Sequence, residues 1–221
     1  MIESSVGRKI VMAASGLSML AFVLVHLLGN ATLYYGPGGI NAYAGTLHRF
    51  GAFVWSFRLV MLTMLLLHVF YGIQVTLENR AAKPQAYAVR ENLASTFAGR
   101  SMIWTGLLIG LFILLHLLHF TFQVISPEIA AGRHLDIQGR PDVFMMVVQS
   151  FRKLPAVLLY LAALGALVLH LIHSIQSSFQ TLGLNSAKTL PYMIRAGALA
   201  AMLIFLGYAT FPISIVTGLI K

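Results

Sequence analysis

Residues 102–125 read MIWTGLLIGLFILLHLLHFTFQVI, a run of 24 residues without Asp, Glu, Lys or Arg. A helix of about 20 predominantly apolar residues crosses the hydrocarbon core of a bilayer. Four other stretches have the same character, and together they predict an all-α integral membrane protein with five transmembrane helices in a bundle. The predicted spans are residues 10–33, 53–77, 102–125, 156–175 and 193–219.

The composition favours a bilayer as the main solvent of this chain. Of its 221 residues, 58% are hydrophobic and 10% are charged, and the mean hydropathy is +0.83; soluble domains carry about 25% charged residues. We therefore expect residues 1–221 to form a single transmembrane domain without a separate soluble catalytic domain. The first stretch is too long for a signal peptide and no small-residue cleavage site follows it, so we expect it to be retained.

Polar segments connect the spans, and no repeat of fixed period is evident among them. The first connection, residues 34–49, contains the chain-breaking run Gly-Pro-Gly-Gly. The second, residues 78–100, has the composition of a short surface helix around residues 87–95. The third, residues 126–153, holds three of the six acidic residues, and the fourth, residues 181–191, is short.

Cysteine is absent, and Lys and Arg outnumber Asp and Glu. The lack of cysteine excludes disulfides, cysteine-bound zinc, iron–sulfur clusters held by this chain and thioether-linked haem. The net charge of +9 is distributed between the apolar stretches, which favours contact with lipid headgroups over nucleic acid. With five spans, eight Lys and Arg residues lie on the membrane side that holds the N-terminus and seven lie on the opposite side. The positive-inside rule therefore only slightly favours a cytoplasmic N-terminus.

Four histidines, His26, His68, His116 and His170, lie deep inside four different spans. Each is 14 to 16 residues from the apolar start of its span, or about 21–24 Å into a core of about 30 Å. Because successive helices are antiparallel, His26 shares one level with His116, and His68 shares another with His170, about 10–18 Å away. This arrangement predicts two stacked haems, each held by two imidazoles.

Any one of these histidines alone is best interpreted as a core residue that is hydrogen-bonded to Ser, Thr or backbone. Four histidines at paired depths on four helices favour coordination instead. Zinc or copper would need more ligands at each level, and the spans hold no carboxylate or cysteine to supply them.

Small residues near these positions support a flat ligand between the helices. Gly16 and Gly106 each precede a histidine by ten residues, and Gly72 follows His68 by four; glycine gives a macrocycle clearance. His119 and His173 lie one turn after His116 and His170. They are alternative ligands or, as we favour, hydrogen-bond partners of a propionate, a quinone or a neighbouring helix.

Short motifs follow one another in a characteristic order along nearly the whole chain. They are SVGRK (Ser5–Lys9), Ser15-Gly16-Leu17 leading to HLLGN (His26–Asn30), NAY (Asn41–Tyr43), LHVFYG (Leu67–Gly72), WTG (Trp104–Gly106) leading to HLLHF (His116–Phe120), DVFMMVVQSF (Asp142–Phe151), HLIHS (His170–Ser174) and SFQTLGL (Ser178–Leu184). In this order they resemble the cytochrome b membrane-anchor subunit of succinate dehydrogenase and quinol:fumarate reductase, the complex II family, in its five-helix, two-haem bacterial form.

The resemblance implies two bis-histidine haem b groups with four axial ligands. His68 and His170 would hold the proximal haem, facing an iron–sulfur subunit at the cytoplasmic side, and His26 and His116 the distal haem. The ten-residue spacing from glycine to histidine selects His116 over His119 as the ligand. The resemblance also implies the bacterial cytoplasmic membrane as the location, with the N-terminus in the cytoplasm.

The function implied is electron transfer between membrane menaquinone or menaquinol and the iron–sulfur subunit. That subunit serves a flavoprotein that interconverts succinate and fumarate in the tricarboxylic acid cycle or anaerobic respiration, so no flavin or dicarboxylate site is expected in this chain. Two other functions remain open. One is the dihaem cytochrome b of a formate dehydrogenase, hydrogenase or nitrate reductase, and the other is a haem-free channel, transporter or scaffold with histidines as proton relays.

The chain departs from some relatives in its carboxylates. Val168 occupies a position where some fumarate reductases of this type carry a glutamate, and no acidic residue lies between Glu3 and Glu78. Proton handling at a quinone would then fall to Tyr43, His48, His119, water or propionates. Arg8 and Trp104 are candidates for propionate contacts. A charge at the membrane surface is the alternative that we favour for most basic residues at that face, and an interfacial aromatic explains Trp104 equally well.

Overall fold

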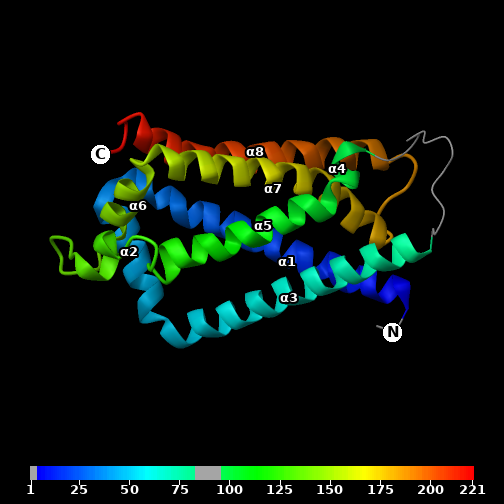
Figure 1. Ribbon diagram of the computed structural model, residues 1–221, viewed down its shortest axis with the longest axis horizontal. Coiled ribbons are helices and arrows are strands. Elements are labelled where there is room, and N and C mark those ends of the chain that lie inside the picture. The colour runs from blue at the N-terminus through cyan, green and yellow to red at the C-terminus, as the bar shows by residue number, and fades with distance from the viewer. Residues whose placement is uncertain (1–3, 83–95) are drawn as a thin grey trace.

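Five long helices dominate the computed structural model, which describes residues 4–82 and 96–221. They are α1 (Ser5–Ala31), α3 (Gly51–Ala81), α5 (Met102–His116), which continues as a π-helical turn at Leu117–Thr121, α7 (Leu154–Thr181) and α8 (Leu190–Val216). All five are long and apolar enough to cross a membrane, which confirms the expectation of an all-α protein with five candidate membrane-spanning helices. The two termini lie at opposite ends of the molecule (Figure 1).

Several helices are longer than the apolar stretches that predicted them. Helix α1 begins at Ser5 because the Oγ of Ser4 accepts a hydrogen bond from the backbone N–H of Gly7 at 3.0 Å and caps the first turn. Helix α3 continues past its apolar stretch to Ala81. In a bilayer, such polar turns would reach the headgroup region, which adds roughly 10–15 Å to the hydrocarbon core.

The chain-breaking run after the first span begins a helix instead of a loop. A 3-10 turn at Thr32–Tyr35 leads into α2 (Gly36–Arg49). Pro37 lies in the first turn of α2, where its missing N–H has no partner to lose, and Gly36 adopts φ 70° at the corner. The chain-breaking run therefore separates α1 from α2 and does not prevent a helix within this connection. The surface helix expected at residues 87–95 lies outside the described residues.

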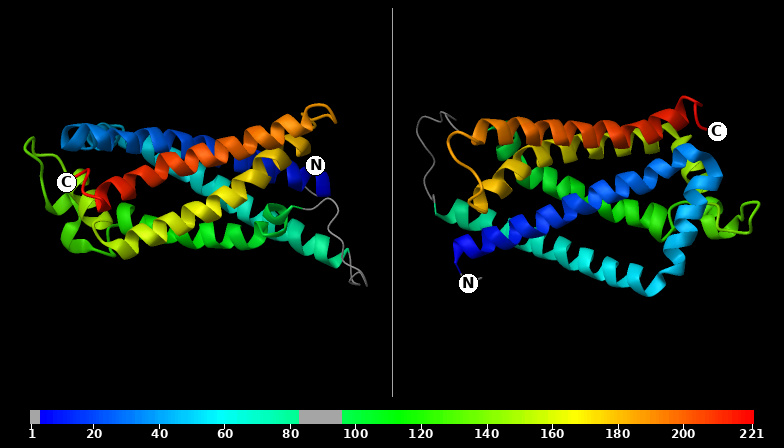
Figure 2. Two further views of the ribbon diagram at one scale, coloured as in Figure 1. Left: turned by 90° about the horizontal axis from the view of Figure 1, so that it is seen from above. Right: turned by 180° about the vertical axis from the view of Figure 1, so that it is seen from behind.

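Helix α1 lies obliquely between α3 on one side and α7 and α8 on the other (Figures 1 and 2). Helix α8 packs along α7, where Gly197 lets the two backbones approach. A Cβ at Gly197 would lie 3.3 Å from Ile175 Cγ2. Helix α3 contacts α1 extensively and α5 only slightly, so much of its apolar surface faces outward. Phe53, for example, is 71% exposed, as expected for a side chain that contacts lipid.

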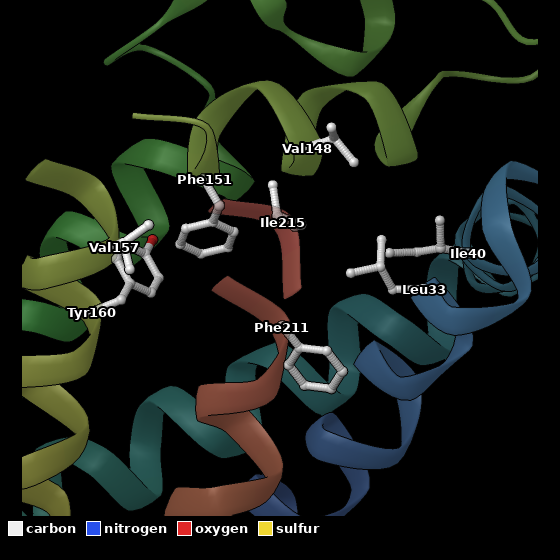
Figure 3. Packing of buried hydrophobic residues seen from close by; sticks show 8 residues of the cluster. All are labelled: Leu33, Ile40, Val148, Phe151, Val157, Tyr160, Phe211 and Ile215. Atoms are coloured by element: carbon white, nitrogen blue, oxygen red, sulfur yellow. The ribbon is translucent and has the colours of Figure 1, made fainter. Parts of the chain in front are cut away.

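The best-packed region lies at the end of the bundle that holds the C-terminus. There α2 and α6 (Val143–Phe151), which forms within the third predicted connection, close over the ends of α1, α7 and α8. Figure 3 shows the buried cluster at this end. It comprises Leu33, Ile40, Val148, Phe151, Val157, Tyr160, Phe211 and Ile215. Packing in this cluster fixes the position of the Tyr160 ring.

Candidate functional site

The four histidines within the candidate membrane-spanning helices form two pairs. The rings of His26 on α1 and His116 on α5 have centroids 5.9 Å apart, and those of His68 on α3 and His170 on α7 have centroids 6.2 Å apart. We call His68 and His170 the N-end pair, because their level is nearer the end of the bundle with the N-terminus. His26 and His116 are the C-end pair. The structure thus brings together the residues that were predicted to share a depth.

Hydrogen bonds at Nδ1 set the tautomers of the N-end pair. His68 Nδ1 lies 3.0 Å from the backbone oxygen of Met12, which can only accept, so Nδ1 carries the hydrogen. His170 Nδ1 lies 3.2 Å from Thr105 Oγ1. The Thr105 hydroxyl can donate its own hydrogen to the carbonyl of Ser101 at 3.1 Å, and it then accepts from His170. In both rings the Nε2 lone pair is left available.

In the C-end pair, His116 Nδ1 lies 3.3 Å from the hydroxyl of Tyr160. No described side chain or backbone group forms a hydrogen bond with the ring of His26, which instead stacks on Phe22 with centroids 5.4 Å apart. Three of the four imidazoles therefore have Nδ1 held by a neighbouring helix. This is the arrangement by which proteins orient a metal-binding imidazole through its second nitrogen.

Two glycines provide the space for the N-end pair. A Cβ on Gly16 would lie 3.0 Å from His68 Cε1, and one on Gly106 would lie 3.4 Å from His170 Cε1. Each glycine is ten residues before the C-end histidine of its own helix, so the two levels are about 15 Å apart along the helices. These glycines therefore lie at the N-end level and seat the imidazoles of the facing helices.

The two halves of the site are related by an internal repeat that was not predicted. Helix α1 matches α5 when residue numbers are shifted by 90, and α3 matches α7 when they are shifted by 102. The first alignment pairs Met12, Gly16, Phe22 and His26 with Met102, Gly106, Phe112 and His116. The second pairs Leu65, His68, Ile73 and Gln74 with Leu167, His170, Ile175 and Gln176. The unequal shifts hide the repeat from a search at one fixed period.

A cavity of about 220 Å³ lies beside the C-end pair. Its polar lining includes His119 and Tyr160, which are joined by a 3.2 Å contact between His119 Nδ1 and the Tyr160 hydroxyl. The other lining residues are Leu115, Ile125, Ser126, Ser150, Lys153, Pro155, Ala156 and Leu159. His119 is buried, and the π-helical turn that contains it is a feature often found at functional sites. The Tyr160 hydroxyl thus touches both the cavity residue His119 and the paired residue His116.

The other predicted quinone residues lie away from this cavity lining. His48 is exposed on α2, with Nδ1 2.8 Å from the carbonyl of Ala44 in its own helix. Tyr43 packs its ring against Gly29, where no Cβ would fit. Of the three predicted residues, the structure therefore places only His119 at the cavity.

The remaining predicted residues lie toward the N-terminal end. Arg8 forms an ion pair with Glu78 of α3 at 3.0 Å. Trp104 is 67% exposed on α5. His173 packs against Gly99 in α4 (Phe97–Arg100), with its Cε1 3.1 Å from the Cβ that an alanine would add there. Gly72 faces Met12 of α1. A Cβ added to Gly72 would lie 3.9 Å from the Met12 sulfur.

A polar network at the C-terminal end of the bundle was not predicted. Asn41 is 1% exposed; its Nδ2 donates to Asp142 Oδ1 at 3.1 Å and to Asp136 Oδ2 at 3.3 Å, and its Oδ1 accepts from the N–H of Phe144. The Arg140 guanidinium bonds Asp136 at 2.8 Å and holds the pKa of that carboxyl well below its usual range. The three acidic residues within residues 126–153 are the sequence feature that could have indicated this network.

The histidine pairs are not a conventional multidentate metal site. Within residues 4–82 and 96–221, no group of three or more His, Asp or Glu side chains is placed to hold one metal ion. Two imidazoles per level suit a metal whose other ligands come from a macrocycle. Comparison with models of protein families, with curated proteins and with solved structures finds no match for this chain.

Proposed function

We propose that this protein is the dihaem cytochrome b membrane-anchor subunit of a succinate:quinone or quinol:fumarate oxidoreductase. It would transfer electrons between membrane menaquinone and an iron–sulfur subunit. The observation that carries the proposal is the presence of two imidazole pairs from four helices at two levels, with three Nδ1 atoms already bonded. The order of the sequence motifs supplies the choice of complex.

The spacing of each pair leaves room for a metal that the two imidazoles would hold between them. Two metal–nitrogen bonds of about 2 Å, with about 1 Å from each nitrogen to its ring centroid, separate the centroids by about 6 Å. The observed separations are 5.9 Å and 6.2 Å. His26 and His116 would hold one haem b, and His68 and His170 the other. Haems held in this way would supply one-electron transfer.

The chain's own contribution is to orient the imidazoles and control their surroundings. The carbonyl of Met12 and the hydroxyl of Thr105 accept from Nδ1 of His68 and His170, so these rings keep Nε2 as the ligand atom. Such acceptors also raise the basicity of an imidazole ligand. The apolar stretches that contain the four histidines hold no Asp or Glu, and in such surroundings a low dielectric would strengthen every remaining charge interaction.

The cavity beside His119 is the proposed place for the quinone headgroup. Its lining is mostly apolar, which suits a naphthoquinone ring, and His119, Ser126 and Lys153 offer polar groups to the quinone oxygens. Tyr160 links this cavity to His116 through two contacts of 3.2 Å and 3.3 Å. We expect His119→Leu to weaken the binding of a menaquinone analogue and His48→Leu, the control outside the lining, to leave it unchanged.

Haem stoichiometry of purified variants tests the ligand assignment. The wild type is expected to contain two haem b per chain, and alanine at any one of His26, His68, His116 or His170 should remove one haem. Alanine at His119 or His173, each one turn away, should leave both in place, as should the exposed loop variant His134→Ala. An unchanged haem content in all four ligand variants would contradict the proposal.

A further inference from the structure

Tyr208 of α8 packs against the imidazole of His26. The centroids of the two rings are 6.2 Å apart, and their planes are tilted by 36°. Phe22, one turn before His26 on α1, stacks on the same imidazole with centroids 5.4 Å apart and planes 22° apart. Besides its partner His116, the His26 ring therefore has two aromatic neighbours, one from its own helix and one from α8.

Two further contacts hold α8 against α1 at this level. The Tyr208 hydroxyl donates to the backbone oxygen of Val23 at 2.7 Å, on the turn that precedes His26. At the neighbouring position Gly207, an added Cβ would lie 2.9 Å from Leu27 Cδ2, so the missing side chain lets the two helices approach closely there. Helix α1 therefore fixes the position of Tyr208 through its hydroxyl and through the backbone beside it.

His26 differs from the other three paired histidines in how its ring is held. Each of the other rings has Nδ1 within hydrogen-bond distance of a neighbouring helix. Among the residues that the structure describes, none forms a hydrogen bond with the ring of His26, and Asn30 Nδ2 donates only to its backbone oxygen, at 2.7 Å. Rotation of an imidazole about its last side-chain bond has a broad energy minimum. Packing against other side chains must therefore set the plane of the His26 ring.

The angle between the two imidazoles of a pair can be measured when they hold a ferric haem. The planes of the C-end pair, His26 and His116, are 87° apart, close to perpendicular. Perpendicular imidazoles interact with different d orbitals of the iron and keep these two orbitals close in energy, which gives a large spread of g values. If one ring turns toward the parallel arrangement, the orbitals separate and the largest g value falls. Since the C-end pair is nearly perpendicular, any substantial rotation of His26 lowers that value.

We propose that Tyr208 is a positioning residue that fixes the plane of the His26 imidazole and takes the place of a hydrogen bond to its Nδ1. This inference rests on the proposed function, since it requires a haem held by His26 and His116. Tyr208 acts through His26 and is not itself a ligand. Helix α8, which has no counterpart in the internal repeat, thus contributes to the C-end pair although it carries no histidine.

Electron paramagnetic resonance of the oxidised, purified full-length protein tests this role. Tyr208→Leu removes the aromatic ring and remains apolar. We expect this variant to keep two haems and to lower the largest g value of the centre whose signal is lost in His26→Ala, while the other centre keeps its signal. Tyr208→Phe, which retains the ring, should keep most of the wild-type value. Tyr192→Leu makes the same change at an exposed tyrosine in the first turn of α8 and should alter neither centre.

An unchanged largest g value in Tyr208→Leu would overturn the inference. An equal shift of both centres would also overturn it, because that result indicates a general loosening of the bundle. If Tyr208→Leu does not accumulate in the membrane, Tyr208→Met replaces it with the same expected result, since the flexible methionine side chain can fill the space that the ring leaves. A wild-type protein without low-spin haem would instead refute the proposed function itself.

Discussion

Substituting Gly16 by alanine tests how closely α1 approaches the N-end pair. The added Cβ would lie 3.0 Å from Cε1 and 3.2 Å from Nδ1 of His68, whereas carbon atoms pack best at about 3.5–4.0 Å. The His68 ring cannot simply rotate away, because its Nδ1 is bonded to the carbonyl of Met12 at 3.0 Å. We therefore expect an overpacking cost of about 1–3 kcal/mol in the free energy of unfolding.

Gly110→Ala is the matched control, because no heavy atom lies within 4 Å of the Cβ that it would add to α5. Both substitutions gain the same helix propensity, about 1 kcal/mol, so this gain cancels in the comparison. Gly16→Ala should be about 1–3 kcal/mol less stable than Gly110→Ala. Gly106→Ala, with its Cβ at 3.4 Å from His170 Cε1, should lie near the control.

The measurement is reversible unfolding of the purified protein in mixed detergent micelles, followed by circular dichroism. A double-mutant cycle with His68→Ala adds a second criterion, because removing the imidazole should remove the penalty at Gly16. Equal stability of Gly16→Ala and Gly110→Ala, or a penalty that persists without the His68 ring, would refute this account of the packing.

Three further outcomes are expected. Asn41→Leu removes three hydrogen bonds of a buried side chain and should lower the free energy of unfolding by about 2–4 kcal/mol, whereas the exposed Gln138→Ala should have little effect in the same unfolding assay. The pKa of Asp136 is lowered by Arg140, so its stabilising contribution is complete above about pH 4 and is lost as the pH falls toward the lowered value; an acid titration should find this loss absent in Asp136→Asn. Tyr160→Phe keeps the ring against Phe151, with centroids 4.9 Å apart, but removes the hydroxyl that contacts His116. The electron paramagnetic resonance signal of the haem assigned to His26 and His116 should therefore change, and that of the other haem should remain. Identical spectra of variant and wild type would contradict the contact.

The features that could be predicted from the sequence are those that one physical constraint dominates. The length and apolarity needed to cross a bilayer identify the five helices, and their antiparallel order puts His26 beside His116 and His68 beside His170. These conclusions require only the helix rise and the thickness of the bilayer.

The features that could not be predicted depend on contacts between distant segments or on the exact position of a residue in a helix. The run at Gly36 begins α2 because a proline in the first helical turn loses no hydrogen bond. The role of Asn41 depends on the loop near Asp136, about a hundred residues away in the chain. Tyr160 has the sequence context of an ordinary aromatic in a span, and only the packing of α5 on α7 places its hydroxyl between His116 and His119.

Electron paramagnetic resonance of the oxidised, purified wild-type protein tests the central claim most directly. If His26 with His116 and His68 with His170 each hold one haem, the spectrum should contain two low-spin ferric signals that disappear in two separate steps during reductive titration. A spectrum without low-spin haem, or one with high-spin iron that has an open axial position, would contradict the claim.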